Sequence, residues 1–207
     1  MKDEKNVLGF FFGKLCSTLV VVIFILAIGW SRHLPLVNPA LSNFSPVLAI
    51  FFCGAVYMRG TASWLVPTLA VIGSDLVLNP NYGKNILEPF MLATYGGFAL
   101  TIVIGSIVSR RRKWGNLLGG IFSCSIIFYL LTNTFAWLSN AAYSKTLSGL
   151  WQALTMGLPG FPPTYFFLRN SLLSDLVFTI IFVSGFEWVL SKTKEDNNPA
   201  RIAVAKS

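Results

Sequence analysis

The sequence predicts an all-α integral membrane protein, folded as one bundle of six transmembrane helices. Two features of the composition predict this fold: apolar residues make up 54% of the 207 residues, and charged residues only 12%. A soluble domain carries about 25% charged residues. The third feature is the grouping of the apolar residues into runs, since roughly 20 of them make a helix that crosses a bilayer. Six runs fill residues 1–191 as a single domain, and residues 192–207 form a polar cytoplasmic tail.

The six predicted spans are separated by clear breaks. They cover about residues 7–30, 41–58, 62–78, 89–109, 115–138 and 167–190. Asn38-Pro39 precedes the second span, Pro67 interrupts the third, and residues 79–85 have the composition of a loop. Pro89 suits the first turn of the fourth span. A cleaved signal peptide is the alternative for the first span, but its apolar run is long and no soluble domain follows it.

A different structure is expected between the fifth and sixth spans. Residues 147–156 have the length of one short helix. Gly157, Pro159, Gly160 and Pro162-Pro163 then prevent a continuous span. This part of the chain is therefore predicted to be an interfacial or re-entrant segment.

The basic residues predict the orientation. With both termini in the cytoplasm, the inner side carries Lys2, Lys5, Lys14, Arg59, Arg110, Arg111, Arg112, Lys113, Lys192, Lys194, Arg201 and Lys206. The outer side carries Arg32, Lys84, Lys145 and Arg169. Cytoplasmic loops are enriched in Lys and Arg, so this bias supports an even number of spans. The net charge of +8 is thus a topology signal, and no nucleic-acid partner is expected.

Polar side chains gather at the outer ends of the predicted spans. An aspartate at the centre of a transmembrane helix costs about 2.5 to 3.5 kcal/mol, so each one needs a reason. The inner halves are mostly apolar, which predicts a polar cavity that opens outward above an apolar floor. The predicted ligand-binding residues are Asn43, Asp75, Asn133, Trp137, Arg169 and Asp175. The alternative is structural, because polar residues near helix ends also bond to loop backbone.

Small residues recur every fourth position on two spans, which lets helices approach closely in lipid. One series is Gly97, Thr101, Gly105 and Ser109. The other is Gly9, Gly13 and Ser17, the predicted docking face for a partner membrane protein. Packing within the bundle is the alternative for both.

Motifs of soluble enzymes are absent from the sequence, so no enzyme activity and no cofactor are expected. The sequence contains neither a phosphate-binding glycine-rich loop with its lysine nor a nucleophile elbow. Cys16, Cys53 and Cys124 lie inside apolar runs without metal-ligand spacing, and His33 is the one histidine, so no metal is expected. An intramembrane enzyme built on Asp75 and Asp175 is the remaining catalytic hypothesis.

Several short motifs resemble a family of small bacterial membrane proteins of unknown function, related to the substrate-binding S components of energy-coupling factor (ECF) transporters. The resemblance covers about residues 32–182 and rests on short matches. These are Arg32-His33-Leu34-Pro35, Asn43-Phe44-Ser45-Pro46, Pro67 with Ser74-Asp75-Leu76, the Thr132-Asn133-Thr134-Phe135-Ala136-Trp137 stretch, Tyr143, Gly149 and Leu173-Ser174-Asp175.

The resemblance implies a six-helix S component in the bacterial cytoplasmic membrane. Such a subunit binds a vitamin or similar micronutrient near the outer surface. It works with a membrane coupling subunit and cytoplasmic ATPases supplied as separate chains. S components often carry alanines four apart on helix 1 for docking, where this sequence has Gly9, Gly13 and Ser17. The alternatives are a structural or assembly subunit of a larger membrane complex and a self-sufficient secondary transporter.

Overall fold

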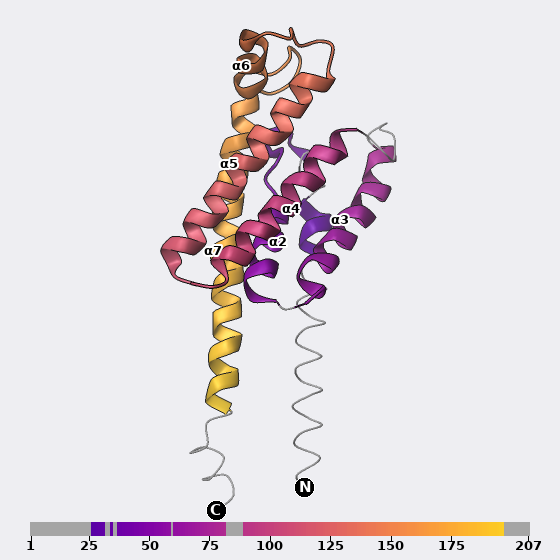
Figure 1. Ribbon diagram of the computed structural model, residues 1–207. Coiled ribbons are helices and arrows are strands. Elements are labelled where there is room, and N and C mark those ends of the chain that lie inside the picture. The colour runs from indigo at the N-terminus through magenta and orange to yellow at the C-terminus, as the bar shows by residue number, and fades with distance from the viewer. Residues whose placement is uncertain (1–25, 32–33, 35–36, 59, 82–88, 197–207) are drawn as a thin grey trace, which may run out of the picture.

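The chain folds into a bundle of α-helices, shown in Figure 1 as a computed structural model. It describes residues 26–31, 34, 37–58, 60–81 and 89–196. The elements are η1 (Pro39–Leu41), α2 (Val47–Tyr57), α3 (Ala62–Asn81), α4 (Phe90–Val108), α5 (Trp114–Ser139), α6 (Leu147–Thr155) and α7 (Thr164–Asp196). These ranges contain no β-strand, and the predicted all-α class is confirmed.

Three of the helices are long and apolar enough to cross a membrane. They are Phe90–Val108, Trp114–Ser139 and the Thr164–Ser191 part of α7. At 1.5 Å per residue, α4 is about 28 Å long and α5 about 39 Å, against a hydrocarbon core of about 30 Å. The lengths and the apolar composition of these helices are therefore compatible with a membrane-crossing bundle. Residues 26–31 are helical and Ile28 is fully buried, whereas the rest of the first predicted span, with Gly9, Gly13 and Ser17, lies outside the described residues.

The second helix begins later than predicted. α2 starts at Val47, and residues 41–46, which were expected to be helical, are not part of it. The cause is local: Asn43 has a φ of 64°, in the left-handed region, and Pro46 is the N-cap of α2. With 11 residues, α2 is about 16 Å long, half the thickness of a hydrocarbon core. Its residues are almost all buried, so α2 is the central helix of the bundle.

The third helix is continuous, and the predicted interruption at Pro67 was wrong. α3 also includes residues 79–81, which were predicted to lie in a loop. Pro67 has no N–H to donate to the carbonyl of Ser63, one turn earlier. That carbonyl faces α2 at Gly54, where an added Cβ would lie 2.7 Å from the Ser63 oxygen. The lost hydrogen bond therefore coincides with a close contact between two backbones.

α4 and α5 form an antiparallel pair whose bounds lie within one residue of the predicted ones. The small residues of α4 pack inside the bundle, as the alternative interpretation has it. A Cβ at Gly97 would lie 2.4 Å from the ring of Phe128 on α5. A Cβ at Gly105 would lie 2.9 Å from the carbonyl oxygen of Phe52 on α2. A Cβ at Gly120 would also meet the Phe52 ring, so this side chain fits between α4 and α5.

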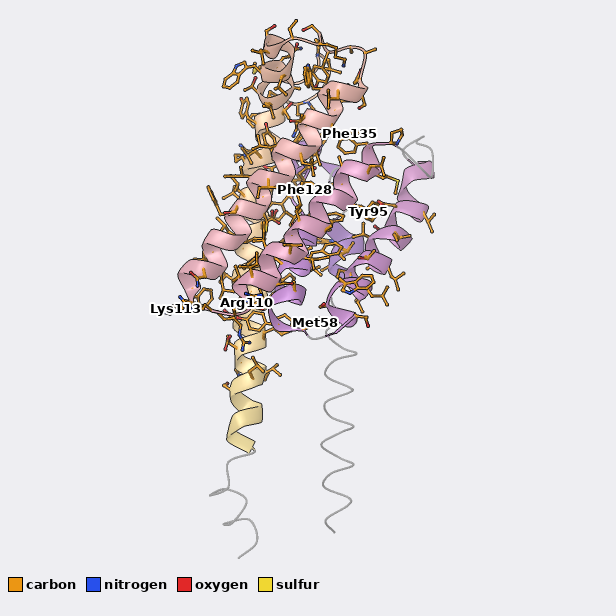
Figure 2. All side chains as sticks on the ribbon, viewed as in Figure 1. Met58, Tyr95, Arg110, Lys113, Phe128 and Phe135 are labelled. Carbon is orange, nitrogen blue, oxygen red and sulfur yellow. The ribbon has the colours of Figure 1, made fainter. Side chains whose placement is uncertain are left out.

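The two ends of the bundle differ in chemistry. Figure 2 shows Met58, at the end of α2, beside Arg110 and Lys113 of the α4–α5 turn. α6 lies at the opposite end, beside the end of α5 and the start of α7 (Figure 1). The short helix predicted at residues 147–156 is confirmed as α6, with Thr146 as its N-cap. We refer to the end at residues 110–113 as the basic end and to the other as the α6 end.

α7 is longer than the span predicted at residues 167–190. It runs from Thr164 to Asp196, so residues 192–196 of the predicted polar tail continue the helix. Its buried residues, such as Asp175 and Val183, pack against α2 and α5. In Figure 1, α7 continues well past the α4–α5 turn.

Candidate ligand-binding site

Asp75 lies on α3 in a nearly closed environment. Its side chain is 7% exposed. The hydroxyl of Tyr95, on α4, donates a hydrogen bond of 3.0 Å to the Asp75 Oδ2. The bond joins two helices that both pack against α2. A carboxylate and a phenol thus meet between α3 and α4.

An aromatic cluster adjoins this pair. The edge of the Tyr95 ring meets Phe98 with centroids 5.8 Å apart and an interplanar angle of 89°. Phe98 stacks on Phe51 of α2 at 4.6 Å and on Phe128 of α5 at 5.5 Å. Figure 2 shows Tyr95 and Phe128 between the basic end and the α6 end. A carboxylate beside aromatic rings suits a cationic or hydrogen-bonding heteroaromatic ligand.

Asp175 has a different environment, since it is 2% exposed within the bundle core. The Ser125 hydroxyl on α5 donates to its Oδ2 at 2.7 Å, and the Ala49 backbone N–H donates to the same carboxyl group. Ala49 lies in the first turn of α2, where N–H groups have no partner within the helix. The N-cap Pro46 supplies no side-chain bond. Asp175 therefore caps α2 from another helix.

Arg169 and Asn170 join α7 to the chain before α2. The Asn170 amide donates to the carbonyls of Ala40 at 2.7 Å and Ser42 at 2.9 Å. Its Oδ1 accepts hydrogen bonds from Arg169, whose guanidinium group lies 4.7 Å from the centre of the Phe166 ring. Asn170 thus holds η1 and the following turn in place.

Asn133 and Trp137 bond to backbone at the α6 end of α5. Asn133 donates to the Tyr129 carbonyl of its own helix at 2.8 Å. The Trp137 indole donates to the Ser144 carbonyl at 2.8 Å, and Lys145 donates to the Trp137 carbonyl. These bonds shape the α5–α6 connection. Asn43 is exposed and sits in the turn before α2.

The six residues predicted to bind a ligand thus divide into two groups. Asp75 faces an aromatic cluster and bonds to a side chain on another helix. The other five have contacts within the fold: Asp175 bonds to Ser125 and to the start of α2, Asn133 and Trp137 bond to backbone carbonyls, Arg169 bonds to Asn170, and Asn43 is an exposed turn residue. Ligand contact by any of the six stays a prediction. Sequence reasoning missed Tyr95, whose only signal was a hydroxyl within an apolar run.

The described residues contain no group of three or more His, Cys, Asp and Glu side chains that would hold a metal. Cys53 and Cys124 are free thiols, both buried. Cys16 and His33 lie outside the described residues.

Over the described residues the chain is all-helical, and three of the helices there are long and apolar enough to cross a membrane. Residues 14–199 match the model of a family described as "Family of unknown function (DUF6580)". The match covers most of the chain, which therefore belongs to this family. No curated protein and no solved structure matches the chain.

Proposed function

We propose that this protein is the substrate-binding membrane subunit of a bacterial uptake system of the ECF type. In this proposal six helices cross the cytoplasmic membrane, with both termini in the cytoplasm. The ligand, a vitamin or similar micronutrient, binds at Asp75 and Tyr95. A separate coupling subunit and cytoplasmic ATPases complete the transporter. The observation that carries the proposal is the Asp75 carboxylate beside the aromatic cluster.

The charge of Asp75 is the first argument. A carboxylate in a transmembrane helix costs about 2.5 to 3.5 kcal/mol, and a hydrogen bond to a charged group returns about 1.5 to 3 kcal/mol. A bond between α3 and α4 needs no charge, because an asparagine at the same position would accept from Tyr95 equally well. A negative charge is useful where a cationic or strongly donating ligand group binds.

The depth of the residue is the second argument. Asp75 lies about 20 Å along α3 from Ala62, where the helix begins at the basic end. It is thus nearer the α6 end, which the distribution of Lys and Arg assigns to the outer side. A substrate-binding subunit needs its site there. The exposed Trp64 and Trp114 open α3 and α5 at the basic end, as residues at a membrane interface do.

Native mass spectrometry of the gently purified protein tests the proposal. We expect a reproducible small-molecule adduct that is lost in Asp75→Asn, because this variant removes the charge and keeps the acceptor for Tyr95. The matched control is Glu187→Gln. Glu187 also accepts a tyrosine hydrogen bond, from Tyr57 at 2.9 Å, but it is exposed and on α7. An adduct retained in Asp75→Asn would refute the site.

A structural or assembly subunit is the second candidate, favoured by a specific observation. Asp175, Asn170 and Trp137 hold backbone groups of the bundle itself, so most of the outer polar residues have a structural task. This candidate predicts co-purification with one fixed membrane partner. It also predicts thermal stability that no small molecule changes, with Asp75→Asn behaving as Glu187→Gln does.

A further inference from the structure

A groove runs along α4 and α5 at the basic end. It holds about 740 Å³ and is open on one side. Arg110 and Arg111 are among the residues that line it, together with Gly115, Gly119 and Ser123 of α5. These three small residues are exposed, and a Cβ added to either glycine would meet nothing within 4 Å. The small residues therefore leave space along the outer surface of α5.

The mouth of the groove is suited to an anion. Arg110 and Arg111 are exposed, and α5 begins at Trp114 directly after the turn that carries them. The N-cap Lys113 makes no side-chain bond to the first turn, which has no acidic residue. N–H groups of a first helical turn lack partners within the helix and attract phosphate. Two arginines that line the groove therefore lie beside a helix N-terminus.

The rest of the groove is suited to a hydrocarbon chain. From Gly115 to Ser123 it follows α5 for about 12 Å, from the turn toward the middle of the helix. α5 is one of the three helices able to cross a membrane, so this direction leads from the interface into the hydrocarbon region. Ile107, on the last turn of α4, adds an apolar wall. A soluble anion would use only the mouth.

We propose that this groove binds an anionic phospholipid, with the phosphate at Arg110 and Arg111 and an acyl chain along Gly115, Gly119 and Ser123. Basic pockets between membrane helices bind acidic head groups by the same chemistry. The site is separate from Asp75 and Tyr95. The proposal requires only that the bundle lies in a membrane, so it does not depend on the proposed function.

The test is lipid retention by the full chain, reconstituted in nanodiscs of phosphatidylcholine and phosphatidylglycerol and then extracted into detergent for native mass spectrometry. We expect wild-type protein to keep phosphatidylglycerol selectively. The double variant Arg110→Gln, Arg111→Gln loses two charges from the groove, and we expect retention to fall roughly tenfold or more.

The matched control is the double variant Arg112→Gln, Lys113→Gln. It removes the same charge from the same turn, but neither residue lines the groove, and the Arg112 guanidinium lies 5.2 Å from the centre of the Tyr57 ring. We expect it to keep the lipid. If both double variants lose the lipid to the same extent and have the same thermal stability, the lipid is held by diffuse attraction to the charged turn. This result would overturn the proposal.

The acyl part has its own pair of variants. Gly119→Leu fills the groove and leaves the charge unchanged, so we expect lipid loss. Gly185→Leu adds the same bulk on α7, where a Cβ also meets nothing within 4 Å, and should keep the lipid. Glycerol phosphate, which carries a head-group phosphate without an acyl chain, tests the soluble-anion alternative. If the wild-type protein retains glycerol phosphate as well as it retains phosphatidylglycerol, or if Gly119→Leu retains the lipid, the site is for an anion alone and the lipid proposal fails.

Discussion

Substitution of Gly105 by alanine tests the packing of α2 against α4. The added Cβ would lie 2.8 Å from the Cβ of Ala55 and 2.9 Å from the carbonyl oxygen of Phe52. Non-bonded carbon atoms prefer about 3.5 to 4.0 Å, so one helix must move by about 1 Å. Neither neighbour is the flexible end of a side chain. Phe52 is itself fully buried, which leaves α2 little freedom to move.

The expected magnitude is the balance of two effects. Overpacking a core costs about 1 to 3 kcal/mol, whereas replacing a helical glycine by alanine contributes about 0.5 to 1 kcal/mol. We therefore expect Gly105→Ala to lower the free energy of unfolding by about 1 to 2 kcal/mol. The control Gly185→Ala lies on α7 with open space around the new Cβ. It should raise the free energy of unfolding by about 0.5 to 1 kcal/mol.

Reversible unfolding in mixed micelles, with increasing dodecyl sulfate and circular dichroism as the readout, measures both variants. The decisive quantity is the difference between them, because both carry the same chemical change in a helix interior. If Gly105→Ala is as stable as Gly185→Ala, the inference that α2 and α4 approach closely at this position is wrong.

Three further predictions concern polar contacts. Asp175→Ala leaves the buried N–H of Ala49 without its acceptor and should cost about 1 to 3 kcal/mol, while Asp175→Asn keeps an acceptor. Hydrogen exchange in the first turn of α2 separates the two, and unchanged protection in Asp175→Ala would disprove the cap. Asn170→Ala releases η1 from α7, so limited proteolysis should become faster before α2 and nowhere else. Thr146→Ala removes the hydrogen bond to the N–H of Gly149, and should cost about 1 kcal/mol and fray α6, seen as faster amide exchange there with α5 unaffected.

Much of the fold could be predicted because several helices start and stop on local signals. Pro89 is the N-cap of α4, the basic turn at residues 110–113 separates α4 from α5, and Thr146 caps α6. Each signal acts through neighbouring residues: a missing N–H, charges that avoid the membrane, or a hydroxyl that bonds to the first turn. The bounds of these three helices were accordingly predicted to within one residue.

Other features depend on contacts between distant parts of the chain. Pro67 is normally a reason to end or kink a helix, yet α3 continues through it beside Gly54 of α2. The predicted start of α2 was wrong for a local reason, since Asn43 and Pro46 are both poor helix residues in that position. Its capping by Asp175 was not local, because the carboxyl group comes from the last helix of the bundle.

The sequence by itself determined that the chain is helical and apolar, where most helices lie, and which polar residues need an explanation. Only the tertiary structure decided which explanation each of them has. Asp75 and Asp175 share the context Ser-Asp-Leu-Val, yet one meets Tyr95 beside aromatic rings and the other caps α2. The physical reason is that a buried carboxylate takes its role from the donors around it, and those donors come from other helices.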